Sequence, residues 1–202
     1  MNSKTLTACP GKYLKHLSLL FAALFMICFF SSNRLYATKC MPTVPTDSAI
    51  NKNKFLKVKL DTEVDSILVV KRFRHMYVFN HGLLLKVYNI SLGESPIGPK
   101  HFQGDRKTPE GLYYIDHKNP YSMAHKSLAI SYPNNKDRQF ARKYGKPTGG
   151  DVMIHGILNG DEANAKDYVG SDWTWGCIAI TNEEVDELFT YVKLGAPINI
   201  LP

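Results

Sequence analysis

The chain has 202 residues, a net charge of +7 and a hydrophobic fraction of 44%. Four of its 25 Lys and Arg residues, and none of its 18 acids, lie in the first 37 residues, which leaves a net charge of +3 for residues 38–202. That modest surplus is typical of an ordinary solvated surface and argues against a nucleic-acid-binding protein. The four cysteines include no C-x-x-C pair, so we expect no metal site and no cofactor.

The N-terminal segment has the pattern of a signal peptide. Three lysines precede an apolar run at residues 17–30. Spanning a bilayer takes about 20 apolar residues, whereas the apolar part of a signal peptide has about 7–15. We predict that residues 1–37 export the protein and are removed after Ala37. The alternative is an uncleaved N-terminal anchor, which is the one membrane contact that we expect.

The next segment, residues 38–53, is rich in Pro, Thr, Ser and Asn and holds few large apolar side chains. Such a segment buries too little apolar surface to offset the entropy of ordering, so we predict a flexible linker. A single domain is then expected over residues 54–202. A disulfide between Cys40 in the linker and Cys177 stays open as an alternative to a free thiol.

From residue 55 onward the patterns are those of short β-strands and a few helices. Asn80-His81-Gly82 predicts a tight hairpin turn, because Asn and Gly tolerate positive φ. A helix is expected over residues 135–144, and the capping-box spacing of Thr181 and Glu184 predicts another. Strands are predicted at residues 55–60, 66–70, 74–79, 83–90, 112–115, 127–132, 152–154, 178–180 and 198–200. Many strands with one or two short helices indicate a mainly β sandwich or barrel.

Two short motifs combine a nucleophile with a base. His155 ends one predicted strand, and Cys177 stands directly before another. A thiol becomes a nucleophile when a nearby base takes its proton. Gly156 and Gly176 adjoin the two side chains, and glycine lets the chain turn so that neighbouring N–H groups point at a developing oxyanion. A lone cysteine in an apolar run is more often a core residue, but the joint pattern favours a catalytic pair.

This order of motifs resembles the L,D-transpeptidase catalytic domain, also called the YkuD-like domain. The family pattern is His-Gly, a spacer and [Ser/Thr]-x-Gly-Cys, and this chain reads His155-Gly156 and then Thr174-Trp175-Gly176-Cys177. The Gly-Asp and Thr-Pro-Glu-Gly of residues 104–111, Gly149-Gly150-Asp151 and Asp172-Trp173-Thr174 are similar to the YafK-like branch. The resemblance covers about residues 64–200 and implies an L,D-transpeptidase-type β-sandwich or barrel.

The resemblance implies a cysteine enzyme of the periplasm or cell envelope that acts on peptidoglycan stem peptides. In that reading His155 takes the proton of Cys177, and the thiolate forms a thioester at the L-centre of diaminopimelate. The Gly156 carbonyl orients the imidazole, and the amides around Trp175 and Gly176 hold the oxyanion. Substrate contacts are expected from three further residues, Thr174, Trp173 and Asp105.

Several alternatives stay open at this point. An amine that resolves the thioester gives transfer, whereas water gives a hydrolase that cuts stem peptides or protein–peptidoglycan links. A wall-linked protein is therefore a further expected partner, and a non-catalytic wall-binding module is a weaker reading. Polar residues 159–171 are expected to form a lid or a surface insertion.

The chain departs from the family pattern at two positions. Many members carry histidine where Trp175 stands and arginine where Ala179 stands. Loss of that arginine removes a positive charge near the thiol, which is expected to raise the pKa of Cys177 or to alter how a substrate carboxylate is held.

Overall fold

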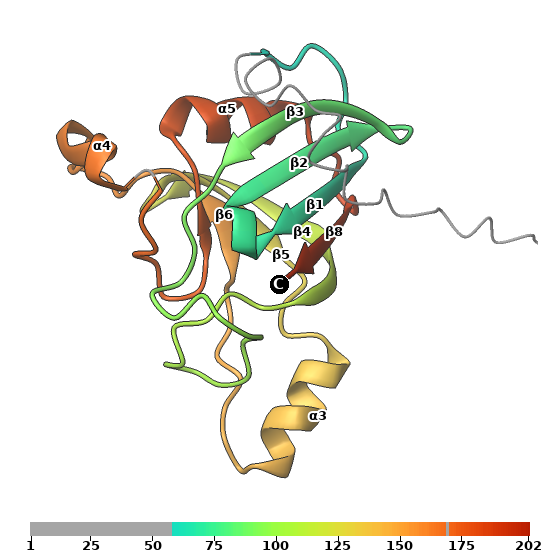
Figure 1. The fold of residues 1–202 in the computed structure, drawn as a ribbon, viewed down its shortest axis with the longest axis vertical. Helices are drawn as coiled ribbons and strands as arrows, with labels where there is room; N and C mark the ends of the chain where they lie inside the picture. The colour runs from blue at the N-terminus through green and yellow to red at the C-terminus, as the bar shows by residue number, and fades with distance from the viewer. Residues whose placement is uncertain (1–57, 169) are drawn as a thin grey trace, which may run out of the picture. The chain divides into compact units, whose positions relative to one another are not determined.

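The computed structural model describes residues 58–168 and 170–202, and the predictions made for residues 1–37 and 38–53 lie outside them. Figure 1 shows strands that form a mixed sheet, with α5 (Asn182–Tyr191) beside it and with α3 (Asn135–Lys143) and α4 (Ala165–Tyr168) extending away from it. The strands lie in the order β3-β2-β1-β8-β4-β5-β6-β7. Their bounds are β1 (Ser66–Val70), β2 (His75–Asn80), β3 (Leu83–Asn89), β4 (Gly111–Ser122), β5 (His125–Ile130), β6 (Met153–His155), β7 (Ile178–Ala179) and β8 (Pro197–Leu201). The prediction of a mainly β fold is confirmed.

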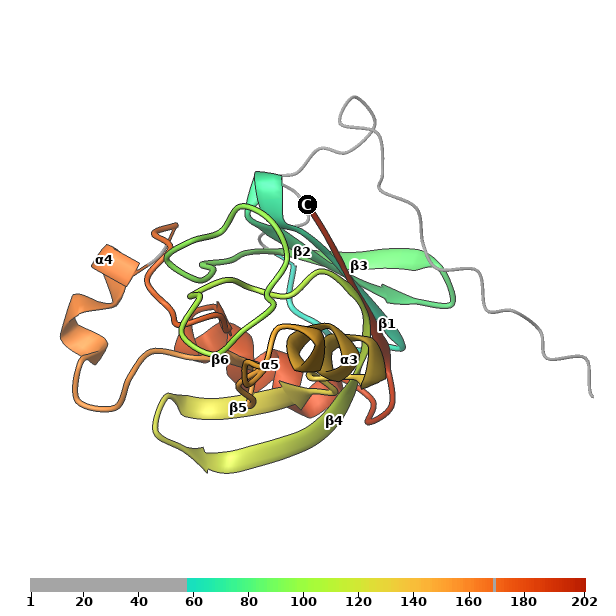
Figure 2. The same ribbon diagram turned by 90° about the horizontal axis from the view of Figure 1, so that it is seen from below.

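The long strand β4 joins two parts of the sheet. Residues 111–114 pair antiparallel with β8, and residues 115–122 pair antiparallel with β5. Figure 2 shows β5 and the adjoining part of β4 set apart from β1, β2 and β3. Strand β1 pairs with β2 on one side and with β8 on the other, and all five of its residues are buried. Burial on both faces explains why its sequence is a continuous apolar run rather than an alternating one.

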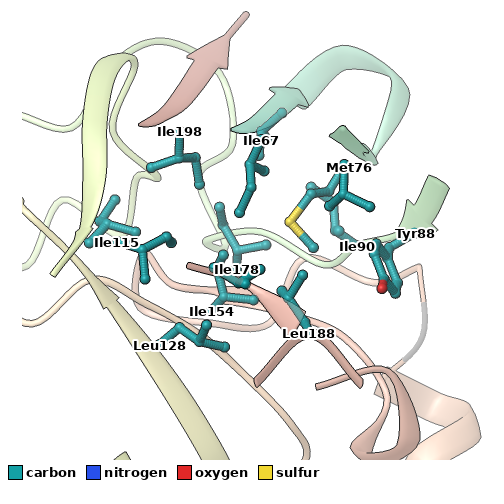
Figure 3. Close-up of a cluster of buried hydrophobic side chains, with 14 of the residues drawn as sticks. Ile67, Met76, Tyr88, Ile90, Ile115, Leu128, Ile154, Ile178, Leu188 and Ile198 are labelled. Carbon is teal, nitrogen blue, oxygen red and sulfur yellow. The ribbon is translucent and has the colours of Figure 1, made fainter. Parts of the chain in front are cut away.

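Apolar side chains from both parts of the sheet meet in one core (Figure 3). Ile67 and Ile198 come from β1 and β8, Ile154 and Ile178 come from β6 and β7, and all four are fully buried. Leu188 joins them from α5 (Asn182–Tyr191). Burial of each such side chain stabilises the fold by about 1.5–3 kcal/mol. The inward direction of Ile154 and Ile178 also fixes which face of β6 and β7 points away from this core.

Both longer helices begin at the residues that the sequence indicates. Thr181 and Glu184 exchange hydrogen bonds in a capping box at the start of α5, as predicted. Asn134 and Asp137 form a second capping box at the start of α3 (Asn135–Lys143). Three shorter helical elements are η1 (Lys71–Phe73), η2 (Glu162–Asn164) and α4 (Ala165–Tyr168). Helix α5 packs on β5 and β6 and so lies against the strand that carries His155.

One prediction of local structure was wrong in the part that the structure describes. Residues 58–60, the described end of the strand predicted at 55–60, are not a strand. The Leu60 amide donates to Glu187 of α5 at 2.5 Å instead of joining a ladder. Residues 159–171, expected to form a lid or a surface insertion, contain η2 and α4. Within residues 58–168 and 170–202, none of the helices has the length and apolar character needed to cross a bilayer.

Candidate active site

The pairing of β6 with β7 brings His155 and Cys177 to the same face of the sheet. The two strands are parallel, with Ile154 opposite Ile178 and His155 opposite Ala179. One step earlier in this register, Cys177 stands level with Met153. Successive side chains alternate between faces. Because Ile154 and Ile178 point into the core, His155 at the end of β6 and Cys177 directly before β7 both point away from it.

Cys177 lines an open pocket of about 560 Å³. The pocket walls come from three segments, namely residues 100–106, 149–152 and 175–177. Cys177 carries a free thiol and is half-buried. Its Sγ lies 3.6 Å from the carbonyl oxygen of Asp151, which accepts a weak hydrogen bond from the thiol. The sulfur is therefore reached from the pocket while most of its surroundings are protein.

The imidazole of His155 is held in one tautomer. Its Nδ1 lies 2.7 Å from the carbonyl oxygen of Gly156, and a carbonyl only accepts hydrogen bonds, so Nδ1 carries the proton. Burial lowers the pKa of His155, and the hydrogen bond to Gly156 offsets only part of that effect. A neutral ring with its proton on Nδ1 leaves the Nε2 lone pair available as a base.

Close packing requires glycine at position 156. A Cβ at this position would lie 2.4 Å from Oδ1 of Asn182, the first residue of α5. The same Oδ1 accepts from the amide of Ile157 at 2.8 Å, and the Gly156 amide donates to the carbonyl of Ala124 at 3.1 Å. Helix α5 and the turn before β5 thus hold the chain at Gly156, whose carbonyl orients His155.

A tight turn from Thr174 to Cys177 presents the thiol. Thr174 is buried, and its hydroxyl donates to the Cys177 carbonyl at 2.8 Å and accepts from the Gly176 amide at 3.1 Å. Gly176 has φ +131°, and a Cβ there would lie 2.7 Å from the carbonyl oxygen of Lys107. Both facts exclude other residues at position 176. The amide of Gly176 is engaged inside the turn, so the amides of Trp175 and Cys177 are the candidates for an oxyanion.

Comparisons with known proteins identify the family of this domain. The family model for the YkuD L,D-transpeptidase catalytic domain matches residues 65–200. The chain belongs to the L,D-transpeptidase catalytic domain family. The Escherichia coli K12 protein described as "Putative L,D-transpeptidase YafK" is 35% identical over 113 residues, which cover 54% of this chain and 37% of that protein.

The solved structure of the helical cell shape determining protein Pgp2 from Campylobacter jejuni has a related fold. It gives a TM-score of 0.51 and 28% identity over 75% of this chain and 51% of the Pgp2 chain. A second Pgp2 structure, of a point mutant of that protein, gives the same TM-score at 26% identity and covers 78% of this chain and 56% of that one. The match therefore spans about half the length of Pgp2 and less than half of YafK.

The two tryptophans of this L,D-transpeptidase domain lie in different environments. The ring of Trp173 meets the His155 ring edge to face at 5.7 Å between centroids and packs against Tyr168 at 4.7 Å. Trp175, in contrast, is 77% exposed and lines the pocket, with the Arg106 guanidinium 5.6 Å from its ring centroid. Trp173 is therefore a packing neighbour of the imidazole, and Trp175 is the aromatic surface that a ligand in the pocket would meet.

Asp105, expected to contact substrate, has a different environment. Its carboxylate accepts from Lys100 Nζ at 2.7 Å and from the amides of His101, Phe102 and Lys107 at 2.7–3.1 Å. Burial alone would raise the pKa of Asp105, but these hydrogen bonds outweigh burial and lower it. Asp105 organises the loop from within, and Lys100 and Arg106 are the charged residues of this loop that line the pocket.

Sequence reasoning missed Lys100 as a pocket residue. It lies four residues before the Gly104-Asp105 motif, and the polar context of that segment gave no sign that its ammonium is buried. Gly149-Gly150-Asp151 was noticed as a motif, but its place in the wall of the pocket became visible only in the fold. Among residues 58–168 and 170–202, no three His, Cys, Asp or Glu side chains are grouped closely enough to hold a metal ion.

The thiol and the imidazole are both neutral in the resting site. Burial raises the pKa of Cys177, and the nearby charge of Asp151 adds to the increase. A hydrogen bond from the Met153 amide and the positive charge of Lys100 oppose it. Since the pKa of His155 is lowered, the thiolate–imidazolium pair is the minor form near neutral pH.

Proposed function

We propose that this domain is an exported L,D-transpeptidase that acts on peptidoglycan stem peptides through a thioester on Cys177. The observation that carries the proposal is the β6–β7 register, which turns Cys177 and His155 to one face, with the free thiol lining an open pocket. Membership of the family supplies the substrate class. A structural cysteine in a core would have no route to a ligand.

The reaction begins with proton transfer from Cys177 Sγ to Nε2 of His155. The thiolate attacks the carbonyl carbon at the L-centre of diaminopimelate and forms a tetrahedral intermediate. The negative oxygen is stabilised by the amides of the turn that ends at Cys177, those of Trp175 and Cys177. The imidazolium then gives its proton to the leaving amine, and a thioester remains.

The second half-reaction resolves the thioester and regenerates the free enzyme. An amine of another stem peptide, or of a wall-linked protein, enters the pocket and attacks the thioester carbonyl. His155 takes the proton of that amine and returns it to the departing sulfur. Water in place of the amine gives a shortened stem, so transfer and hydrolysis share the first half-reaction and diverge only at this step.

The location of the reaction follows from the leader pattern of residues 1–37 and from the substrate. We place the protein in the periplasm or cell envelope, where peptidoglycan lies. Pgp2 is described as determining helical cell shape, and a role of this protein in cell shape is part of the proposal.

Incubation of the purified protein with defined tetrapeptide muropeptides, followed by mass spectrometry, tests the proposal. Cross-linked dimers indicate transfer and shortened stems indicate hydrolysis; both products require the thioester. Cys177→Ser and His155→Asn variants are the matched controls and should give neither product. Unchanged muropeptides that nevertheless co-sediment with the protein would identify a wall-binding module and overturn the proposal.

A further inference from the structure

The ammonium of Lys100 is buried beside the turn that presents Cys177. Its side chain is 5% exposed, and Nζ donates to Asp105 Oδ1 at 2.7 Å and to the Phe102 carbonyl at 3.1 Å. A buried ammonium is costly unless it is paired, and these two partners fix its position. The loop of residues 100–107 is thus built around one cation that faces the pocket.

The position of this cation relates it to the nucleophile. Nζ of Lys100 lies 3.7 Å from the point where a Cβ on Gly176 would stand, and Gly176 is bonded to Cys177. Both Lys100 and Cys177 line the same pocket. Gly176 has no side chain, so no side chain at that position separates the ammonium from the turn.

The other charged groups around the thiol do not place a positive charge comparable to the Lys100 ammonium beside it. Asp151 is an acid and acts in the opposite direction. Arg106 is 46% exposed, so solvent screens its charge far more than that of Lys100, which is 5% exposed. His155 is neutral until it accepts the thiol proton. The charge of Asp105 is shared among four donors, as described above.

The strand that follows the nucleophile offers no cation. Ala179 is buried and is bonded through its amide and its carbonyl to Ser91. We propose that Lys100 is a positioning residue that stabilises the Cys177 thiolate. The inference deepens the proposed function and rests on Cys177 as its nucleophile. As the proton passes from Sγ to Nε2 of His155, the developing negative charge on sulfur meets the fixed ammonium.

Alkylation of Cys177 by iodoacetamide as a function of pH tests this inference without any substrate. The full chain is labelled, and the Cys177 peptide is followed by mass spectrometry because three other cysteines are present. An opposite charge within about 4–6 Å shifts a pKa by about 1–3 units, and one unit is a tenfold change in thiolate fraction. In Lys100→Met, labelling at pH 7 should slow about tenfold, and the midpoint of the pH–rate profile should move upward.

Two further variants separate charge from structure. Lys100→Arg keeps the charge and should restore most of the parental rate. Lys107→Met removes a cation of the same loop whose Nζ donates to the Ile97 carbonyl at 2.8 Å, and it should leave the profile unchanged. If Lys100→Met does not fold, Lys100→Gln removes the charge but can still donate a hydrogen bond to Asp105, and it should show the same slower labelling.

A parental midpoint in Lys100→Met, or in Lys100→Gln, would overturn the inference. Slow labelling that Lys100→Arg fails to restore would also overturn it, in favour of a purely structural role. The outcome is independent of turnover. If the pH–rate profile shifts in Lys100→Met but the parental protein leaves muropeptides unchanged, the role of Lys100 is retained and the proposed function is rejected. If the profile does not shift but the parental protein forms dimers, the proposed function is retained and the role of Lys100 is rejected.

Discussion

The sheet core and the pocket of this domain are held together by different interactions. The core joins β1, β8, β6, β7 and α5 through interlocking aliphatic side chains. The pocket walls are loops, fixed by the buried Lys71–Glu110 and Lys100–Asp105 pairs and by the Arg74–Asp172 pair. The core spreads its stability over many contacts, whereas the pocket depends on a few polar atoms and close backbone contacts. Single substitutions are therefore expected to weaken the core gradually and to disable the pocket abruptly.

The largest effect is expected from Gly176→Ala. The new Cβ would lie 2.7 Å from the Lys107 carbonyl, so the turn has to move. A displacement of about 1 Å in a reacting group costs about 100-fold in rate, and we expect at least that loss of muropeptide turnover. The control is Gly82→Ala in the β2–β3 hairpin, where φ is +80° but no atom lies within 4 Å of the new Cβ. It should cost about 1–2 kcal/mol of stability and retain activity. Equal losses of activity in Gly176→Ala and Gly82→Ala would contradict the view that the pocket is the more sensitive region.

Lys71→Met should open the loops around the pocket before it unfolds the rest of the domain. The Lys71 ammonium is buried and donates to the carbonyls of Gly98 and Thr108 at 2.8 and 3.0 Å and to Glu110 at 2.8 Å. Its loss leaves a partly buried carboxylate unpaired, at a cost of about 3–5 kcal/mol. Denaturant unfolding gives the stability change, and hydrogen exchange over residues 91–110 should show that this loop opens first.

Ile198→Ala is the matched change in the core. It should cost about 2–5 kcal/mol in unfolding free energy and leave turnover per folded molecule unchanged. The comparison of the two regions breaks down if Lys71→Met molecules that remain folded keep the parental rate.

Thr174→Val tests the hydroxyl that closes the turn. Valine keeps the shape but loses the hydrogen bonds to the Cys177 carbonyl and from the Gly176 amide. We expect a stability loss of about 1–3 kcal/mol, because buried polar groups are left unsatisfied, and a turnover loss of about tenfold. Thr174→Ser restores the hydroxyl and should recover most of the rate. A serine variant no better than valine would mean that methyl packing, rather than the hydroxyl, holds the turn.

The smallest effect concerns pH. Because burial lowers the pKa of His155, the ring stays neutral below the ordinary histidine range. Activity should then persist below about pH 6.5 and fall only as His155 becomes protonated. The unfolded chain binds that proton more readily, so stability is full above about pH 6.5 and declines as the pH falls toward the lowered pKa. An acid limb above pH 7 in the kcat/KM profile would contradict a buried neutral base.

The strands and helices that form the core were predictable from sequence because apolar residues recur at the positions that the fold buries. The run at residues 66–70 and the capping box at Thr181 and Glu184 gave a strand and a helix start that the structure confirms. The sequence pointed to candidate-site residues only where a motif names them, as for Cys177 and His155. Lys100 was not identified because the sequence does not distinguish a buried lysine from a surface lysine. Only the folded loop places its partner, Asp105, beside it.

The most direct test of the proposed mechanism is to trap the thioester. The full chain is mixed with a tetrapeptide stem, quenched in acid within the first turnovers and examined by intact-protein and peptide mass spectrometry. The mechanism predicts a mass increase equal to the stem minus its terminal D-residue, located on the Cys177 peptide and absent from Cys177→Ser. An acyl group on another residue, or products that form without any adduct at Cys177, would contradict it.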